Sequence, residues 1–143
     1  LVPNVSMMTN SVANNGNPFG AADYRKYKND ILDTGLEIKE YDGGTSYHGK
    51  CFVIDEDLLG VGSFNWDMRS TYIDTELMLI INSEELNKDL REKMDNYEKQ
   101  ALEVINLEEY NTPEGMVPQT TSFVREIFLG ILGVFNIFFR FLM

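Results

Sequence analysis

The sequence is poor in cysteine and in positive charge, and each shortage excludes a class of protein. Cys51 is the one cysteine among 143 residues, which excludes an internal disulfide framework and a multi-cysteine zinc site, and fits a reducing compartment. Twelve Lys and Arg stand against 23 Asp and Glu, for a formal net charge of −11. The chain as a whole therefore lacks the electrostatic footprint of a nucleic-acid-binding protein. Any phosphate must meet a local basic site.

Histidine is the scarcest residue of catalytic interest, because His48 is the only one in the sequence. A mechanism that needs two imidazoles cannot be completed by one copy of this chain, so a second chain or a further segment is required. The sequence begins Leu1-Val2-Pro3 and shows no charged leader before an apolar run. We therefore see no signal peptide and expect an excised or truncated piece.

What is present predicts a folded α/β protein. Hydrophobic residues make up 43% and charged residues 24% of the chain, which predicts one packed globular domain. Helix and strand patterns alternate, which favours a mixed sheet flanked by helices. The predicted strands are 5–9, 36–41, 51–54, 58–61 and 77–81, and the first predicted helix is 21–34. A second helix is predicted from a capping box of Asn82 and Glu85, with a buried stripe of Leu86, Leu90, Met94, Tyr97, Ala101 and Val104.

The last part of the sequence has a different composition. Prolines and glycine without periodicity predict a linker over 106–121, between a domain over 1–105 and an apolar C-terminal helix over 122–143. Only 127–135 is free of polar side chains, which is too short to span a bilayer. One helical stripe holds Arg125, Leu129, Leu132, Asn136 and Arg140. This pattern fits a helix in a membrane interface with a narrow polar edge facing water, or a helix docked on the rest of a larger protein.

A dense set of polar residues surrounds the predicted hairpin 51–61. His48 and Lys50 are two residues apart at the entry to a strand, so both side chains project on one face, and Gly49 leaves the space between them open. Gly62 follows the second strand, where Ser63 and Asn65 can reach the same end of the sheet. These residues predict a pocket for an oxyanion. Asp67 and Arg69 are expected to be structural, pairing with each other or capping a turn.

The spacing His48-x-Lys50-x4-Asp55-x6-Gly62-Ser63-x-Asn65, with Glu76 eleven residues later, resembles the HKD signature of the phospholipase D superfamily. The strings 62–70 and 74–77 further resemble the bacterial cardiolipin synthase branch, and the resemblance spans about residues 5–104. It implies a phospholipase D-like half-domain, the C-terminal half of a two-motif enzyme.

In this superfamily one histidine attacks phosphorus to form a phosphohistidine, and the other protonates the leaving alkoxide. The resemblance therefore implies that His48, in the second motif, is the general acid of the first step and the general base of the second. Lys50, Ser63 and Asn65 would bind phosphate oxygens, and Glu76 would accept a ring proton from His48. Asp55 belongs to the motif, although its place after a strand suggests a structural role as much as a chemical one. No metal or other cofactor is implied.

The function implied is that of a phosphatidyltransferase or phospholipase, membrane-associated at the cytoplasmic side of the cell membrane. It would act on a phospholipid, touch the membrane through its C-terminal segment, and need an N-terminal HKD half or a second copy. Two alternatives stay open. One is an HKD-type nuclease or phosphodiesterase working as a homodimer, against which the charge of −11 weighs. The other is a non-catalytic half that docks a partner.

Overall fold

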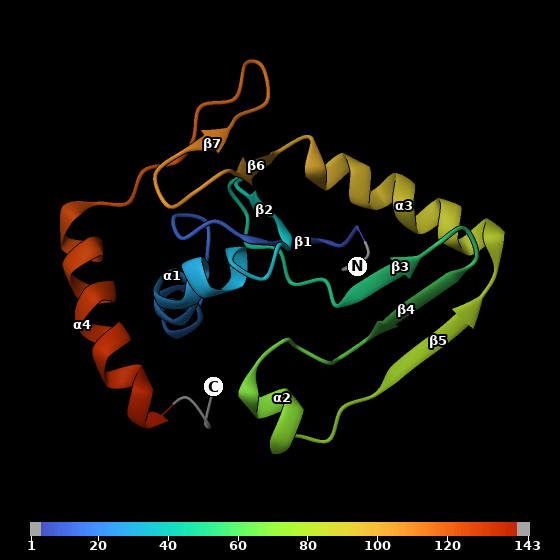
Figure 1. Cartoon of the computed structure of the whole chain (residues 1–143), viewed down its shortest axis with the longest axis horizontal. Helices are drawn as coiled ribbons and strands as arrows, with labels where there is room; N and C mark the ends of the chain where they lie inside the picture. The colour runs from blue at the N-terminus through green and yellow to red at the C-terminus, as the bar shows by residue number, and fades with distance from the viewer. Residues whose placement is uncertain (1–3, 140–143) are drawn as a thin grey trace. The chain divides into compact units, whose positions relative to one another are not determined.

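The computed structural model describes residues 4–139, which form two compact units (Figure 1). The first unit combines the N-terminal residues through Tyr47 with Tyr97–Ile137, and the second is built on His48–Asn96. Each unit has its own sheet flanked by helices. The α/β class is therefore confirmed, with two sheets in place of the single mixed sheet expected.

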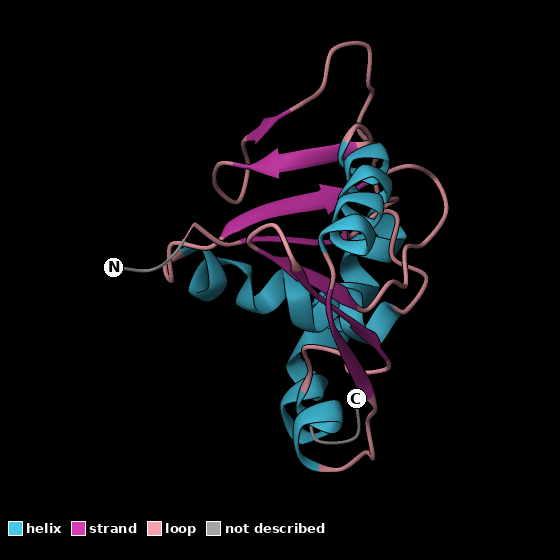
Figure 2. Cartoon of the chain, turned by 90° about the vertical axis from the view of Figure 1, so that its right-hand side faces the viewer, coloured by secondary structure: helices cyan, strands magenta, loops and turns pink. Residues whose placement is uncertain are grey.

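The first unit is built on a mixed four-stranded sheet. Its order is β1 (Ser6–Asn10), β2 (Glu37–Tyr41), β6 (Ala101–Val104) and β7 (Tyr110–Asn111). The first two strands are parallel and the other neighbours are antiparallel (Figure 2). Helix α1 (Pro18–Leu32) is the crossover that a parallel pair requires.

Helix α1 begins three residues before the predicted start. The side chain of Asn17 accepts hydrogen bonds from the backbone nitrogens of Phe19 and Gly20, and Pro18 occupies the first helical turn. Asparagine as N-cap followed by proline is a favoured helix start, yet the same pair is also typical of a turn. The helix ends at Leu32, two residues before the predicted end. The predicted left-handed glycine is confirmed: Gly35 has φ +81° and its backbone nitrogen donates to the carbonyl of Leu32 at 2.9 Å.

A buried ion pair joins α1 to β2. The Lys28 ammonium lies 2.7 Å from Oε1 of Glu40, and both side chains are less than 5% exposed. The hydroxyl of Tyr24 donates to the same carboxylate oxygen at 2.7 Å, and Lys28 donates to the hydroxyl of Tyr110 at 2.7 Å. Burial, with the negative charge of Glu40 beside it, raises the pKa of Tyr24 and keeps its phenol protonated.

The second unit is a three-stranded antiparallel sheet in the order β3 (Cys51–Ile54), β4 (Leu58–Gly62) and β5 (Met78–Asn82). The predicted hairpin is confirmed, with Cys51 opposite Val61. Helix α3 (Glu84–Glu98) follows β5, and the amide of its buried Asn87 donates to the carbonyl of Leu58 at 2.7 Å.

The predicted capping box before α3 is wrong. Asn82 is the last residue of β5, and its amide donates to Oδ2 of Asp57 at 2.9 Å. The hydroxyl of Ser83 accepts instead from the backbone nitrogen of Leu86 at 3.3 Å. Because Asn82 belongs to β5 and pairs with Leu58 of β4, the helix starts one residue later than the pattern indicated.

The buried stripe predicted for α3 is wrong in part: Leu86 and Tyr97 are exposed, and Leu90 and Met94 are half-buried. It also extends too far. The helix ends at Glu98, and Ala101 and Val104 are buried residues of strand β6, paired with β2. The range 106–121, predicted as a linker, contains the short strand β7. The predicted domain boundaries stay a prediction.

The C-terminal helix is present as α4 (Phe123–Phe139), and of the two arrangements that the sequence left open, the one with the polar stripe facing water is wrong. Its polar stripe faces the first unit rather than water. Nη2 of Arg125 donates to the carbonyls of Val12 and Asn15, and the amide of Asn136 donates to the carbonyl of Phe19 at 3.0 Å. Arg140, predicted on the same stripe, lies outside the described residues.

The hydrophobic part of that contact is small. Leu129 of α4 is 1% exposed and packs on Ala21 and Ala22 of α1, with Val12 and Leu132 beside them. Within residues 4–139 we find no helix long and apolar enough to cross a membrane.

Candidate functional site

The predicted site residues, apart from Asp55, come from three segments that lie side by side at one end of the second unit's sheet. The backbone nitrogen of Gly62 donates to the carbonyl of Lys50 at 3.0 Å, which extends the β3–β4 pairing toward His48. The backbone nitrogen of Ser63 donates to the carbonyl of Leu77 at 3.0 Å. The entry to β3, the exit of β4 and the entry to β5 therefore meet at one edge (Figure 1).

Gly62 permits this close approach. A Cβ atom added at Gly62 would lie 2.1 Å from the carbonyl oxygen of Leu77 and 2.4 Å from the sulfur of Met78. A backbone oxygen cannot move aside as a flexible side chain can, so this point of β4 accepts only glycine without a shift of β5.

His48 and Lys50 converge as predicted. The Lys50 ammonium lies 2.9 Å from Nε2 and 3.2 Å from Nδ1 of His48, and it also donates to the His48 carbonyl at 3.3 Å. His48 is exposed and Lys50 is half-buried. An imidazole and an ammonium group thus face solvent together, where a phosphate could reach both.

Glu76 is held by two serine hydroxyls. Ser63 donates to Oε2 of Glu76 and accepts from the backbone nitrogen of Leu77 at 3.1 Å. Hydrogen bonds from Ser63 and Ser70, with the positive charges of Lys50 and Arg69 as smaller causes, lower the pKa of Glu76 below its ordinary value. Glu76 is therefore an ionised acceptor at neutral pH. The contact predicted here was between Glu76 and His48. Instead, the carboxylate of Glu76 accepts hydrogen bonds from Ser63 and Ser70, and the ring of His48 contacts the ammonium of Lys50.

Ser70 is a member of this network that the sequence reasoning did not single out. Its hydroxyl accepts from the backbone nitrogen of Asn65 at 3.2 Å and from the Asn65 amide at 3.4 Å, and it is 6% exposed. Its backbone nitrogen donates to Oδ1 of Asp67 at 2.7 Å, which caps α2 (Met68–Tyr72). The available signal was the Asp67-x-x-Ser70 spacing of a capped turn. Ser70 thus connects the two predicted site residues Asn65 and Glu76.

The structure does not bring Asp55 to this cluster. Asp55 follows β3 at the opposite end of the strand from Lys50, a separation of roughly 17 Å for extended chain. It has φ +48° in the β3–β4 turn, and its carbonyl accepts from the guanidinium of Arg91. This geometry matches the structural role left open for Asp55. Arg69 pairs with Asp74 at 2.7 Å rather than with Asp67.

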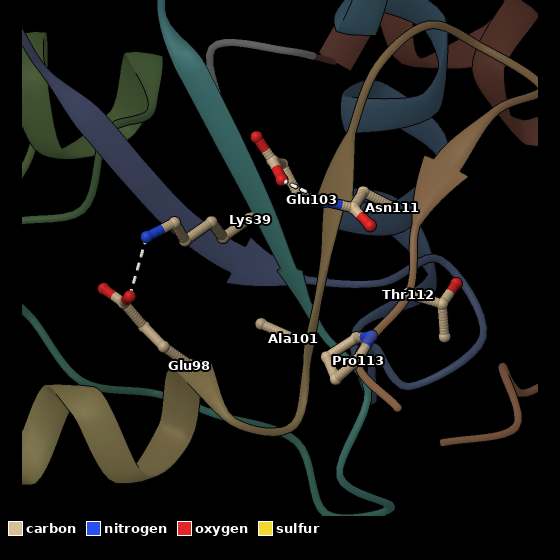
Figure 3. A pocket seen from close by; sticks show the side chains of 7 residues that line it. All are labelled: Lys39, Glu98, Ala101, Glu103, Asn111, Thr112 and Pro113. Carbon is tan, nitrogen blue, oxygen red and sulfur yellow. Dashed lines mark hydrogen bonds and ion pairs between the residues drawn. The ribbon is translucent and has the colours of Figure 1, made fainter. Parts of the chain in front are cut away.

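A separate surface pocket lies within the first unit (Figure 3). Its cation, Lys39, is paired with Glu98 at 2.7 Å and with Glu37 at 3.4 Å. Its other carboxylate, Glu103, accepts from the amide of Asn111 at 2.9 Å. With more carboxylates than cations, this pocket is poorly suited to a phosphate.

The family described as "Cardiolipin synthase, PLD-like domain" matches residues 4–97, about two thirds of the chain. The chain belongs to this family. The match covers every predicted site residue, from His48 to Glu76, and α4 lies beyond it.

Individual relatives agree with this family. The chain is 32% identical to cardiolipin synthase C of Escherichia coli, over 57% of this chain and 21% of that protein. It is 33% identical to cardiolipin synthase A of Yersinia pseudotuberculosis, over 51% of this chain and 15% of that protein. The chain thus spans about a fifth or less of the length of these relatives.

Two solved structures share the fold. Phosphatidylserine synthase of Haemophilus influenzae superposes with a TM-score of 0.65 at 14% identity, over 97% of this chain and 35% of that one. Nuc, a phospholipase D family member of Salmonella typhimurium, superposes with a TM-score of 0.56 at 19% identity, over 72% of this chain and 65% of that one. The phospholipase D-like fold predicted from the motif is confirmed.

Proposed function

We propose that this chain supplies one half of a phosphatidyltransferase site that cleaves the phosphodiester of a phospholipid through a phosphohistidine. The observation that carries the proposal is the cluster of His48, Lys50, Ser63, Asn65 and Glu76 at one end of a sheet, in a chain of this family. The curated relatives named cardiolipin synthase support a phospholipid substrate.

The first step needs a nucleophile from outside this chain, because His48 is its only histidine. An imidazole nitrogen of the other half attacks phosphorus, the P–O bond to the leaving alcohol breaks, and the His48 imidazolium gives its proton to the departing oxygen. In the second step His48 takes a proton from an acceptor alcohol or water, whose oxygen attacks phosphorus and breaks the P–N bond. Two displacements with a good nucleophile and a positioned acid lower each barrier.

The remaining residues have positioning and electrostatic roles in this scheme. Lys50 is near enough to His48 that a phosphate held by one would touch the other, and its positive charge offsets the charge on a non-bridging oxygen. Asn65, fixed by Ser70, offers a second donor. Glu76 is ionised and accepts a hydrogen bond from Ser63, which fixes its carboxylate. It thereby supplies a negative charge near the ammonium of Lys50.

A bipartite site fits this scheme best. We propose that the missing histidine comes from an N-terminal HKD half rather than from a second copy, and that the assembled enzyme works at the cytoplasmic face of the cell membrane, where phospholipid is within reach. The experiment below treats the second copy as the competing arrangement.

The test is phosphatidylglycerol turnover on vesicles, with lipid products identified by mass spectrometry. The chain is assayed alone over a range of concentrations, and then together with an N-terminal HKD half, each time with His48→Ala beside the wild type. We expect turnover only with the other half and its loss in His48→Ala. Cardiolipin as product indicates a transferase, and phosphatidate a hydrolase.

Mixing the wild type with His48→Ala separates the two arrangements. In a homodimer that shares one site, activity falls as the square of the wild-type fraction, whereas in a site shared with another half it falls linearly. Cleavage of an oligonucleotide but not of phosphatidylglycerol would replace the proposal with the nuclease alternative. Turnover that survives His48→Ala in every arrangement would refute it.

A further inference from the structure

Helix α4 presents an apolar face that the first unit leaves uncovered. Six side chains on this face are each between 49% and 76% exposed. We call them the α4 outer face: Val124, Ile127, Phe128, Ile131, Val134 and Phe135. They recur at helical spacing over three turns, so they form one continuous strip along the side opposite Leu129.

The polar side chains of α4 do not interrupt this strip, because they are turned the other way and bonded there. Arg125 donates to two loop carbonyls of the first unit, at 3.1 Å and 2.7 Å. Glu126 pairs with Arg25 at 2.6 Å, and Asn136 is 1% exposed with its amide on the carbonyl of Phe19. Polar contacts on one side therefore fix the helix so that the other side is purely hydrocarbon.

Two cations of α1 lie along the edge of α4. Nη1 of Arg25 lies 3.4 Å from the carbonyl of Glu126, and the ammonium of Lys26 lies 3.2 Å from the carbonyl of Gly133. These contacts are seven residues apart on α4, or about 10 Å along its axis. Both cations are exposed. Together with Arg125, these cations place three positive charges beside α4, against one negative charge from Glu126. The chain as a whole has a net charge of −11.

We propose that the α4 outer face lies on the surface of a lipid bilayer, with Arg25 and Lys26 at the level of the phosphate headgroups. Interfaces between proteins carry a polar rim and are on average little more apolar than the rest of a protein surface. A strip of aliphatic and phenylalanine side chains with cations along its edge matches an interfacial helix, which buries its apolar face in the acyl boundary and sets its charges against anionic headgroups.

The test is flotation with vesicles of phosphatidylcholine and phosphatidylglycerol in a 7:3 ratio. The wild-type chain should float with them. The triple variant Ile127→Gln, Ile131→Gln, Phe135→Gln should lower the partition coefficient by roughly 100-fold, because each change removes an apolar side chain from the buried strip. Ile105→Gln, Leu107→Gln, Val117→Gln is the matched control, since these residues are also exposed apolar side chains of the first unit. It should bind within about twofold of the wild type, by the same area argument.

A direct contact readout covers the case in which the triple variant fails to fold. Ile131→Trp in a Trp66→Phe background places the only tryptophan on the α4 outer face, and acyl-chain-brominated phosphatidylcholine should quench its emission. His48→Ala should float like the wild type, which separates membrane contact from the proposed catalysis. A wild type that stays unbound, or an Ile131→Trp emission that brominated lipid leaves unchanged, overturns the proposal. Loss of self-association in the triple variant with unchanged flotation overturns it in favour of a protein partner.

Discussion

The two lysine–glutamate pairs of the first unit provide a sharp test of how burial controls the energy of an ion pair. Lys28–Glu40 and Lys39–Glu98 have the same separation of 2.7 Å. The first pair is almost fully buried, whereas the side chains of the second are 24% and 32% exposed. Lys28→Met should cost about 3–5 kcal/mol of unfolding free energy, because it leaves the Glu40 carboxylate buried without its cation. Lys39→Met should cost at most about 1 kcal/mol, because water and salt already screen that pair.

The double variant Lys28→Met, Glu40→Gln isolates the electrostatic part. The neutral amide can still accept the hydrogen bond from Tyr24, so the double variant should be more stable than Lys28→Met alone. A coupling energy of at least about 2 kcal/mol between the two positions is expected from a double-mutant cycle. The opposite reasoning, in which the lysine acts only through its aliphatic chain, predicts additive effects.

Amide hydrogen exchange measured by mass spectrometry suits a chain of two compact units, because peptides from β1 and β2 report on the first unit alone. Lys28→Met should speed exchange in these peptides by roughly 100-fold or more, and Lys39→Met by less than about fivefold. Equal effects of the two variants, or additivity in the cycle, would refute the argument from burial.

Three further predictions concern the candidate site. Ser63→Ala should raise the pKa of Glu76 toward its ordinary value of 4.5, since it removes the largest cause of the lowering; a carbon-13 titration of the labelled carboxyl measures this, and an unchanged pKa contradicts the hydrogen-bond assignment. Lys50→Ala should reduce kcat of the assembled enzyme by about 100- to 1,000-fold, as loss of one preorganised donor does, and a change confined to KM would count against this role. Gly62→Ala should abolish turnover and speed exchange in β5 peptides, whereas Gly130→Ala, with open space at its Cβ, should leave both unchanged.

The site was largely predictable because its geometry follows from strand register. His48, Lys50, Ser63 and Asn65 flank a hairpin with a short connection, and a hairpin brings the entry of one strand beside the exit of the next. Ser70 was not predicted, because its position depends on the turn into α2. Asp67 caps that turn, and the turn brings the hydroxyl of Ser70 back to the backbone of Asn65. Spacing along a strand carries no information about such a return.

The end of α3 could not be predicted from periodicity. Ala101 and Val104 continue the apolar spacing of the helix, and neither Gly nor Pro separates them from Glu98. The pairing of β6 with β2 determines that Ala101 lies in a strand rather than in α3, since Tyr41 and Ala101 are direct partners. Long-range strand pairing overrides a local helical pattern when it buries the same side chains in a sheet.

The orientation of α4 shows what an amphipathic pattern specifies and what it leaves undecided. The stripe through Arg125 and Asn136 separates two faces of the helix, and the sequence alone leaves open whether the helix lies in a membrane interface with its polar edge in water or docks on protein. Inside the first unit, however, the polar stripe donates hydrogen bonds to the carbonyls of Val12, Asn15 and Phe19. Satisfying these acceptors turns the hydrocarbon face outward, where it must meet something less polar than water or remain a cost to the folded chain.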